Sequence, residues 1–463
     1  MFKSDIQNIH LVGIGGVGMC GIAEVLLNLG LKVSGSDVVN SEVIERLRLL
    51  GGKIYLGHSE NNVEKADVIV VSTAIAKDNI EVIKAKELKI PVIPRAEMLG
   101  ELMRLKKGIA ISGAHGKTST TSMISLILSK AGLDPTIVIG GKFNNLASNA
   151  KFGGGEYFVA EADESDGSFL NLLPIYAIVT NIDYEHLDYY QDLKEIKQTF
   201  ISFINKVPFY GWVVLCLDDA NIRSILPEIK RRYITYGLET DAQVKAINLV
   251  SKEFSSYFEV VYHGQNLGQI RINVPGRQYV NNSLAAIGMA LELDISYEII
   301  KKALSSYRSV ERRFQIKGNV NGILIIDDYA HHPTEIKATL ESASKSVKRR
   351  IIVVFQPHRF SRTKFLYQEF GKSFHLAHEV IVTDIYAAGE APIEGVEASL
   401  IVEEIRKNGQ DKVRYISNFE EIIRYLKKIA QPNDLIITLG AGNIYQVSSN
   451  LVKELKNKDV VLG

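Results

Sequence analysis

A glycine-rich segment followed by Lys-Thr is the strongest chemical signal in the sequence. Residues 108–119 read Gly-Ile-Ala-Ile-Ser-Gly-Ala-His-Gly-Lys-Thr-Ser, and a helical pattern of apolar residues follows. Glycines let consecutive backbone N–H groups point at phosphate oxygens, a lysine can reach the terminal phosphates, and a threonine hydroxyl can bind Mg²⁺. We therefore predict a strand, a phosphate-binding loop and a helix, with ATP or GTP as the ligand.

The predicted loop is short. The common nucleotide-binding loop places more residues between its first glycine and the Gly-Lys pair, so the segment is either a shortened variant or an ordinary strand-to-helix turn. The expected loop residues are Gly113, Ala114, His115, Gly116, Lys117, Thr118 and Ser119.

Two acidic segments follow expected strands in the same region. The first spans residues 161–166 (Glu-Ala-Asp-Glu-Ser-Asp), and the second spans residues 183–188 (Asp-Tyr-Glu-His-Leu-Asp). A carboxylate at such a strand end can hold Mg²⁺ beside a triphosphate, which makes Glu161 a metal-ligand candidate. His186 could bind a second divalent ion. A solvated acidic turn, or the acidic first turn of a helix, is the alternative interpretation.

A second glycine-rich turn lies near the N-terminus. Residues 13–18 read Gly-Ile-Gly-Gly-Val-Gly, and Asp37 closes the next expected strand. This pattern fits the dinucleotide-binding fingerprint with its ribose-binding carboxylate, and taken alone it indicates NAD. The same geometry holds any pyrophosphate at a helix N-terminus, and close packing of strand and helix would also need the glycines.

Cationic side chains follow expected strands in the last third of the chain. His331 and His332 come after one strand, and His358, Arg359 and Arg362 come after the next. A guanidinium group binds a carboxylate through two parallel hydrogen bonds, so these residues predict a site for a small acid. Surface salt bridges are the alternative.

The composition excludes several classes of partner. The 463 residues include 54 Lys+Arg and 53 Asp+Glu, and the resulting net charge of +1 gives no reason to expect nucleic acid or an anionic membrane. Cys20 and Cys216 lie far apart and suggest neither a disulfide framework nor a cysteine-based zinc site. Without an export signal or a long apolar run, we expect a cytoplasmic protein that acts on small molecules.

Alternating strand and helix patterns predict an α/β protein of three domains, each with a mainly parallel sheet. We expect a Rossmann-like first domain (residues 1–106), a central domain like those of P-loop ATPases (107–311) and a Rossmann-like C-terminal domain (312–463). Expected strands are 9–13, 31–35, 67–72, 91–93, 136–139, 157–161, 176–182, 212–217, 323–328, 351–355, 380–384, 413–416 and 435–439. Residues 257–262 and 269–274 predict an antiparallel hairpin across His-Gly-Gln-Asn at the edge of the central domain.

Seven segments together resemble the signatures of the bacterial Mur ligase family, in order and over essentially the whole chain. They are residues 112–118, 160–169, 180–183, 312–315, 327–335, 355–359 and 386–392. The resemblance implies that the first domain binds UDP rather than a nicotinamide cofactor. It also implies an ATP-dependent reaction of peptidoglycan biosynthesis, in which L-alanine is joined to the carboxylate of UDP-N-acetylmuramate through an acyl phosphate, giving ADP and phosphate.

The resemblance assigns roles to individual residues. It implies UDP-substrate contacts at Gly15, Gly16, Val17, Gly18, Asp37, Ser72 and Thr73. Beyond the phosphate loop, it implies that Asn282 contacts adenine, Arg313 the phosphates and Asp328 the ribose. The implied Mg²⁺ ligands are Thr118, Glu161 and His186. The implied alanine-binding residues are Tyr329, His331, Arg359 and Arg362, and the catalytic set is Lys117, Glu161, His186 and Arg359.

Three other functions remain open from the sequence. A ligase of the same family could add a preformed peptide instead of alanine. An NAD-dependent dehydrogenase with an accessory ATP site would explain the first glycine turn but would leave the phosphate loop and the acidic segments without a shared purpose. A nucleotide-gated binding protein would use both glycine turns without chemistry. For the oligomeric state we expect a monomer or a weak homodimer.

Overall fold

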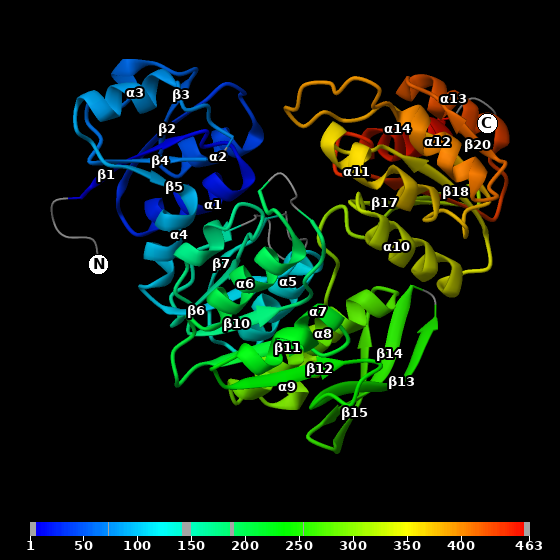
Figure 1. Ribbon diagram of the computed structural model, residues 1–463, viewed down its shortest axis with the longest axis horizontal. Coiled ribbons are helices and arrows are strands. Elements are labelled where there is room, and N and C mark those ends of the chain that lie inside the picture. Colours follow the sequence, from blue (N-terminus) through cyan, green and yellow to red (C-terminus); the bar gives the residue numbers. More distant parts are fainter. Residues whose placement is uncertain (1–5, 73, 141–149, 186–188, 253, 458–463) are drawn as a thin grey trace. The chain divides into compact units, whose positions relative to one another are not determined.

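The computed structural model describes residues 6–72, 74–140, 150–185, 189–252 and 254–457. These residues form three sheets that follow one another along the chain (Figure 1), with strand orders β3-β2-β1-β4-β5, β15-β14-β13-β12-β11-β10-β6-β9-β7-β8 and β16-β17-β21-β18-β19-β20. Most neighbouring strands are parallel, and helices alternate with them along the chain. The predicted α/β class with mainly parallel sheets is therefore confirmed.

The first sheet is parallel and has the strand order of a Rossmann-like half. Its strands are β1 (Asn8–Val12), β2 (Lys32–Asp37), β3 (Lys53–Leu56), β4 (Val68–Val71) and β5 (Val92–Pro94). Its helices are α1 (Val17–Asn28), α2 (Glu42–Leu49), η1 (Glu60–Asn62), α3 (Ile80–Glu87) and α4 (Arg95–Met103). Central strand β1 has a parallel neighbour on each side, and its buried side chains are Ile9, Leu11 and Val12 together with the polar His10.

The second sheet places strand β6 between β9 and β10. Its strands are β6 (Lys107–Ser112), β7 (Thr136–Val138), β8 (Ala150–Lys151), β9 (Tyr157–Glu161), β10 (Tyr176–Val179), β11 (Trp212–Cys216), β12 (Tyr233–Gly237), β13 (Val244–Lys252), β14 (Ser255–Tyr262) and β15 (Gln265–Ile272). The parallel β9, β6 and β10 end at one edge, so the loops that follow them are neighbours.

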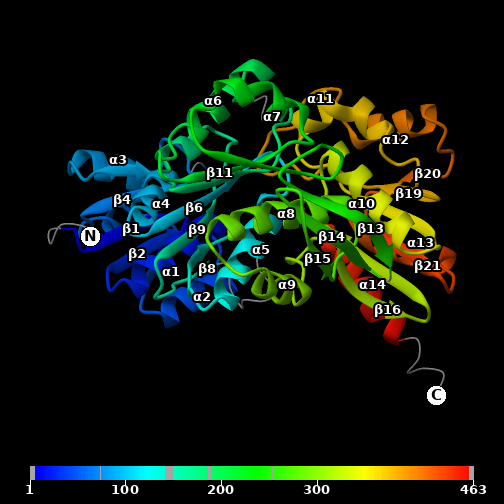
Figure 2. The same cartoon turned by 90° about the horizontal axis from the view of Figure 1, so that it is seen from below.

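Helices of the second region cover this sheet. They are α5 (Lys117–Lys130), η2 (Ser168–Asn171), α6 (Leu193–Ile204), α7 (Ala220–Ile225), η3 (Leu226–Glu228), α8 (Arg277–Glu292) and α9 (Tyr297–Ser305). Helix α5 packs against β9 and against α9 (Figure 2). Beyond its C-cap the chain turns at Gly132, whose φ of 77° is the left-handed conformation that ends a helix.

The predicted hairpin is present at the edge of the second sheet, but its turn is shorter than the sequence pattern suggested. Strands β14 and β15 are joined through His263 and Gly264, whose φ angles are 47° and 83°. Two successive positive φ angles give a two-residue turn, so Gln265 and Asn266 belong to β15.

The third sheet carries one antiparallel edge strand on an otherwise parallel sheet. Its strands are β16 (Gln315–Val320), β17 (Ile323–Asp328), β18 (Arg350–Phe355), β19 (Glu379–Val382), β20 (Val413–Tyr415) and β21 (Asp434–Leu439). Its helices are α10 (Pro333–Ser346), α11 (Phe360–Gly371), α12 (Ala398–Lys407), α13 (Phe419–Ile429) and α14 (Tyr445–Asn457). One face of the sheet packs α13 and α14 around Ile325, Ile352 and Ile436.

The chain divides into two compact units. The first comprises residues 1–247, 259–270 and 281–307, and the second comprises residues 248–258, 271–280 and 308–463. The boundaries of the three predicted domains stay a prediction. A search of the described residues finds no helix with the length and apolar character needed to cross a membrane.

Two phenylalanines of α11 offer a matched test of packing in the third sheet. Phe370 is fully buried and its ring lies 5.3 Å from that of Phe355, whereas Phe365 is 60% exposed. Because Phe370→Ala leaves a cavity in the core, it should lower the free energy of unfolding by about 3–5 kcal/mol. Phe365→Ala, on the same helix, should leave the thermal unfolding midpoint nearly unchanged. Equal midpoint shifts for the two variants, measured by circular dichroism, would contradict this packing.

Candidate active site

The phosphate loop joins β6 to α5, and two of its glycines have no room for a side chain. A Cβ on Gly113 would lie 2.1 Å from Oγ1 of Thr180, and a Cβ on Gly116 would lie 2.5 Å from Oδ1 of Asn282. The φ angles of the two glycines are 131° and 84°, values that residues other than glycine rarely adopt. The loop conformation therefore requires glycine at both positions.

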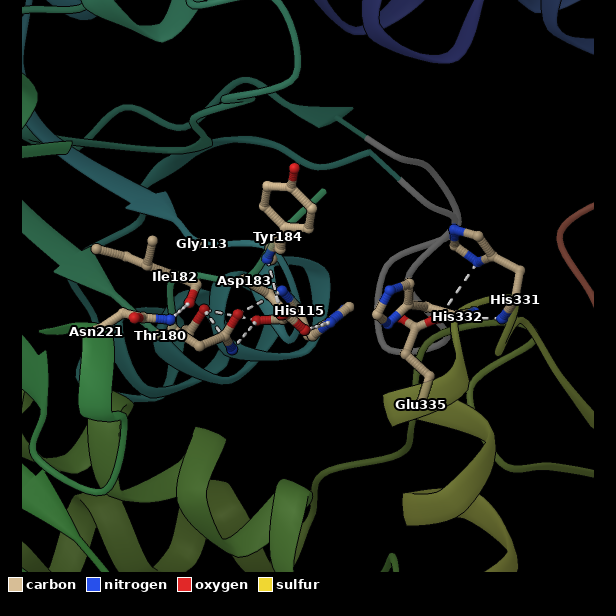
Figure 3. Close-up of polar contacts among 12 residues, drawn as sticks. Gly113, His115, Thr180, Ile182, Asp183, Tyr184, Asn221, His331, His332 and Glu335 are labelled. Atoms are coloured by element: carbon tan, nitrogen blue, oxygen red, sulfur yellow. Dashed lines mark hydrogen bonds and ion pairs between the residues drawn. The ribbon is translucent and has the colours of Figure 1, made fainter. Parts of the chain in front are cut away.

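Two residues that follow β10 hold the loop by its backbone at His115. The Thr180 hydroxyl donates to the carbonyl of His115 at 2.6 Å (Figure 3), and the Asn181 amide donates to the same carbonyl at 2.9 Å. In return, the backbone N–H of His115 donates to Oδ1 of Asn181 at 2.8 Å. Neighbouring strands thus shape the loop before any ligand binds.

Lys117 begins α5, and its ammonium group is enclosed by acceptors. Its Nζ donates to the carbonyl of Gly113 at 2.6 Å and lies 2.8 and 3.0 Å from the two carboxylate oxygens of Glu164. Burial lowers the pKa of Lys117, but the negative charges of Glu164 and Asp163 outweigh this effect and raise it overall. The side chain is therefore a cation, as contact with a terminal phosphate requires.

Oxygen donors gather on both sides of the loop. Glu161 ends β9, Thr118 is the second residue of α5, and Asp183 follows β10 and contacts Nε2 of His115 at 3.1 Å (Figure 3). Hydroxyl and carboxylate oxygens are the ligands that Mg²⁺ prefers, so the chemistry of this donor set fits that ion. His186, the third expected metal ligand, lies outside the described residues.

The N-terminal glycine turn is organised around Asp37. The backbone N–H of Gly15 donates to Oδ2 of Asp37 at 2.9 Å, so this carboxylate shapes the turn as well as standing at the end of β2. Within the described chain, no side chain caps the start of α1 at Gly16, and a Cβ on Gly18 would lie 2.8 Å from Nη1 of Arg95. A helix N-terminus without a side-chain cap and a nearby guanidinium suit an anionic ligand.

The remaining residues expected to bind the UDP substrate lie at the start of α1 and after β4, which is the neighbour of β1 in the sheet. Val17 begins α1 and is half exposed, and Ser72 follows β4. Thr73 lies outside the described residues.

Asp328 is buried in the second unit, and the charge of Arg313 acts on it. Asp328 ends β17 and accepts hydrogen bonds from the backbone N–H groups of Phe314 and Ala330, each at 2.8 Å. Burial raises the pKa of Asp328 to about 6, although Arg313 and these N–H groups act in the opposite direction. Arg313 also lies 3.5 Å from Glu335. The negative charges of Glu335 and Asp328 raise the pKa of Arg313, although burial acts in the opposite direction. Asn282, also expected at ATP, belongs to the first unit.

Four of the residues after β17 and β18 form one chain of contacts. The rings of Tyr329 and His331 lie 5.3 Å apart, and those of His331 and His358 lie 5.6 Å apart. Burial, together with the charges of His331 and Arg362, lowers the pKa of His358 to about 3. Nδ1 of this neutral imidazole therefore accepts from Nη1 of Arg362 at 3.2 Å.

The backbone of Arg359 has an unusual conformation and is held by a hydrogen bond. Its φ of 70° is unusual for a residue with a Cβ, and its N–H donates to the carbonyl of Tyr386 at 2.8 Å. The guanidinium is 41% exposed and lies 3.8 Å from Glu390. A planar group presented in this way suits a carboxylate ligand, and the strained backbone that presents it is typical of functional sites.

The structure also identifies residues to which the sequence gave no role. Thr180 and Asn181 stand in a segment that carried the family resemblance, and Glu164 stands in the first acidic segment, but their contacts with the phosphate loop were not predicted. Nothing in the sequence marked Arg95, because its approach to Gly18 depends on how α4 lies against α1.

The fold and these sites define an α/β nucleotide-binding protein with one phosphate loop and one Rossmann-like glycine turn. Comparison with known families then gives three matches in order along the chain. The Mur ligase family catalytic domain matches residues 8–107, the Mur ligase middle domain matches residues 111–290, and the Mur ligase glutamate ligase domain matches residues 312–442. The chain belongs to the Mur ligase family.

Individual relatives agree with this assignment. A protein of Geotalea daltonii named UDP-N-acetylmuramate–L-alanine ligase is 55% identical over 451 residues, which cover 97% of this chain and 98% of that protein. The crystal structure of UDP-N-acetylmuramate-alanine ligase from Thermotoga maritima has a TM-score of 0.82 at 28% identity and covers 97% of this chain and 99% of that one. A murein peptide ligase from Psychrobacter arcticus shares the fold, with a TM-score of 0.71 at 24% identity and coverage of 97% and 99%.

The raised pKa of Asp328 predicts a specific pH dependence of stability. Its folded pKa of about 6 lies above the ordinary value of 3.8, so its contribution to stability is present below pH 3.8 and is lost as the pH rises through 6. Asp328→Asn removes this loss, which is on the order of 3 kcal/mol. The melting temperature of the variant relative to the wild type should therefore increase between pH 4 and pH 7.5.

The control is Asp411→Asn, at an exposed position in the same unit. Its melting temperature should differ from that of the wild type by a similar amount at every pH. A pH-independent difference for Asp328→Asn as well would show that the buried carboxyl titrates normally.

Proposed function

We propose that this protein is an ATP-dependent ligase that joins L-alanine to the carboxylate of UDP-N-acetylmuramate in peptidoglycan biosynthesis. The observation that carries the proposal is the glycine loop with its enclosed Lys117 beside an acidic strand end. This arrangement occurs in a chain that is 55% identical, over nearly its whole length, to a relative named for that reaction.

The proposal assigns one ligand to each sheet. The glycine turn around Gly15 and Asp37 holds the pyrophosphate end of the UDP sugar. The phosphate loop holds ATP, and Thr118 and Glu161 would hold Mg²⁺. Tyr329, His331, Arg359 and Arg362 bind alanine, with the guanidinium groups on its carboxylate.

The chemistry follows from charge stabilisation and alignment. The muramate carboxylate attacks the γ-phosphorus of ATP, the bond to the β-phosphate oxygen breaks, and ADP leaves an acyl phosphate. Lys117 stabilises the charge on the transferring phosphoryl group, and a bound Mg²⁺ would neutralise charge on the same phosphates. The amine of alanine then attacks the acyl carbon, the amine proton is lost, and inorganic phosphate departs as the amide forms.

The family assignment supports this reading over the alternatives left open by the sequence. A dehydrogenase or a binding protein without chemistry would leave the match of all three ligase domains unexplained. A ligase for a preformed peptide shares the fold, and comparing alanine with a tripeptide as the acceptor separates the two activities.

The route of oxygen tests the proposed mechanism. If the muramate carboxylate is labelled with ¹⁸O, label should appear in inorganic phosphate in proportion to the amide formed, because one carboxylate oxygen stays with phosphorus when alanine displaces it. ADP should be the nucleotide product, as measured by mass spectrometry and chromatography. Label in AMP, or unlabelled phosphate, would contradict an acyl phosphate even if the protein ligates alanine.

Arg359→Lys tests the alanine site while keeping the charge. An ammonium group cannot form the two parallel hydrogen bonds of a guanidinium, so the KM for alanine should rise about tenfold or more. The KM values for ATP and the UDP sugar should not change. Arg424→Lys, at an exposed position on α13, is the matched control and should leave all three constants unchanged. A rise confined to the KM for ATP would instead place Arg359 at a phosphate.

A further inference from the structure

The ion pair between Lys117 and Glu164 stands where the proposed reaction needs a free lysine. The three shortest contacts of Nζ, to Gly113 and to both carboxylate oxygens, account for the three N–H donors of an ammonium group. The side chains are 18% and 3% exposed, so this pair is not a solvated surface contact. A terminal phosphate can take its hydrogen bonds from Lys117 only by displacing the carboxylate.

The backbone of Glu164 is anchored beside the loop. Its backbone carbonyl accepts a hydrogen bond from the hydroxyl of Tyr190 at 2.5 Å, and Tyr190 is itself buried. The same carbonyl accepts from the N–H of Gly167 at 3.1 Å. These contacts hold the backbone of Glu164 in place, so only rotation of the side chain can move its carboxylate away from Lys117.

We propose that Glu164 is the resident counter-anion of Lys117, which the terminal phosphate of ATP displaces, and that it makes nucleotide binding depend on a divalent cation. This inference rests on the proposed function and adds a selection step to it. A buried carboxylate beside an ATP phosphate brings like charges together in a poorly solvated site, which is unfavourable. A cation delivered with the nucleotide removes the repulsion. Metal-free ATP lacks this compensation and should be rejected.

The test compares the affinity for ATP with and without Mg²⁺. Isothermal titration of the full chain gives both dissociation constants, one in excess Mg²⁺ and one in EDTA, and their ratio measures the preference for the magnesium complex. Glu164→Gln keeps the shape of the side chain and removes its charge. We expect it to reduce this ratio about tenfold or more, mainly by tightening the binding of metal-free ATP. Glu164→Ala also removes the charge and serves if the Gln variant is unstable.

Two controls separate the contact from a general change of charge. Asp163→Asn removes a charge that also acts on Lys117, but within the described part of the chain Asp163 makes no hydrogen bond to this lysine. Its effect on the ratio should therefore be smaller, about threefold at most. AMP lacks the terminal phosphates, so its affinity should be the same for the wild type and Glu164→Gln.

The outcomes distinguish this inference from the proposed function. An unchanged or larger ratio for Glu164→Gln overturns the inference, as does an equal effect of Asp163→Asn. If the wild type binds ATP and ligates alanine in either case, the proposed function stands. If the wild type binds no ATP with or without Mg²⁺, the proposed function fails, and the inference fails with it.

Discussion

Phosphate groups are bound by closely spaced backbone N–H groups, and a chain can bring such groups together only where no Cβ stands in the way. In this protein that constraint falls on Gly113, which abuts Thr180, and on Gly116, which abuts Asn282. The abutting residues come from the end of β10 and from α8. The strand order β9-β6-β10 is therefore what gives the loop its shape, because it sets Thr180 and the acidic end of β9 on either side of the turn. The shape of the phosphate loop therefore depends on the order of the strands in the sheet.

Charge is distributed differently in the two units. In the first, the buried carboxylate of Glu164 faces Lys117, so this lysine must exchange partners when an anion binds. In the second, Arg359 and Arg362 lie around a neutral His358, whose low pKa keeps it an acceptor for Arg362. Because the imidazole between these guanidinium groups is neutral, the site keeps a positive charge that suits a carboxylate. The nearly balanced composition of the chain therefore conceals two local charge arrangements suited to different ligands.

Most strands could be read from the sequence because buried parallel strands need continuous apolar runs, as in β9 and β17. Several missed strands lie at sheet edges and lack that signal, whereas β12 was missed although it is a buried parallel strand, because Thr235 interrupts its apolar residues. Strand β3 is partly exposed at a sheet edge, and β16 is an antiparallel edge strand interrupted at Gly318. The loop residues were predictable for a similar reason, since glycine spacing is local chemistry. The hydrogen bond from Thr180 to the loop and the pairing of Glu164 with Lys117 could not be predicted. Both depend on which strands lie side by side, and neither composition nor spacing contains that information.

The dependence of the phosphate loop on later parts of the chain has a consequence for synthesis. The backbone of His115 is held by Asn181, 66 residues further along, and Gly116 abuts a residue of α8 that emerges later still. A ribosome that has made only β6 and α5 has released the nucleotide motif without the residues that shape it. Since long-range contacts form after the segments they join, nucleotide affinity arises late in translation. We therefore expect nascent chains that lack these residues to bind ATP more weakly than the complete chain does.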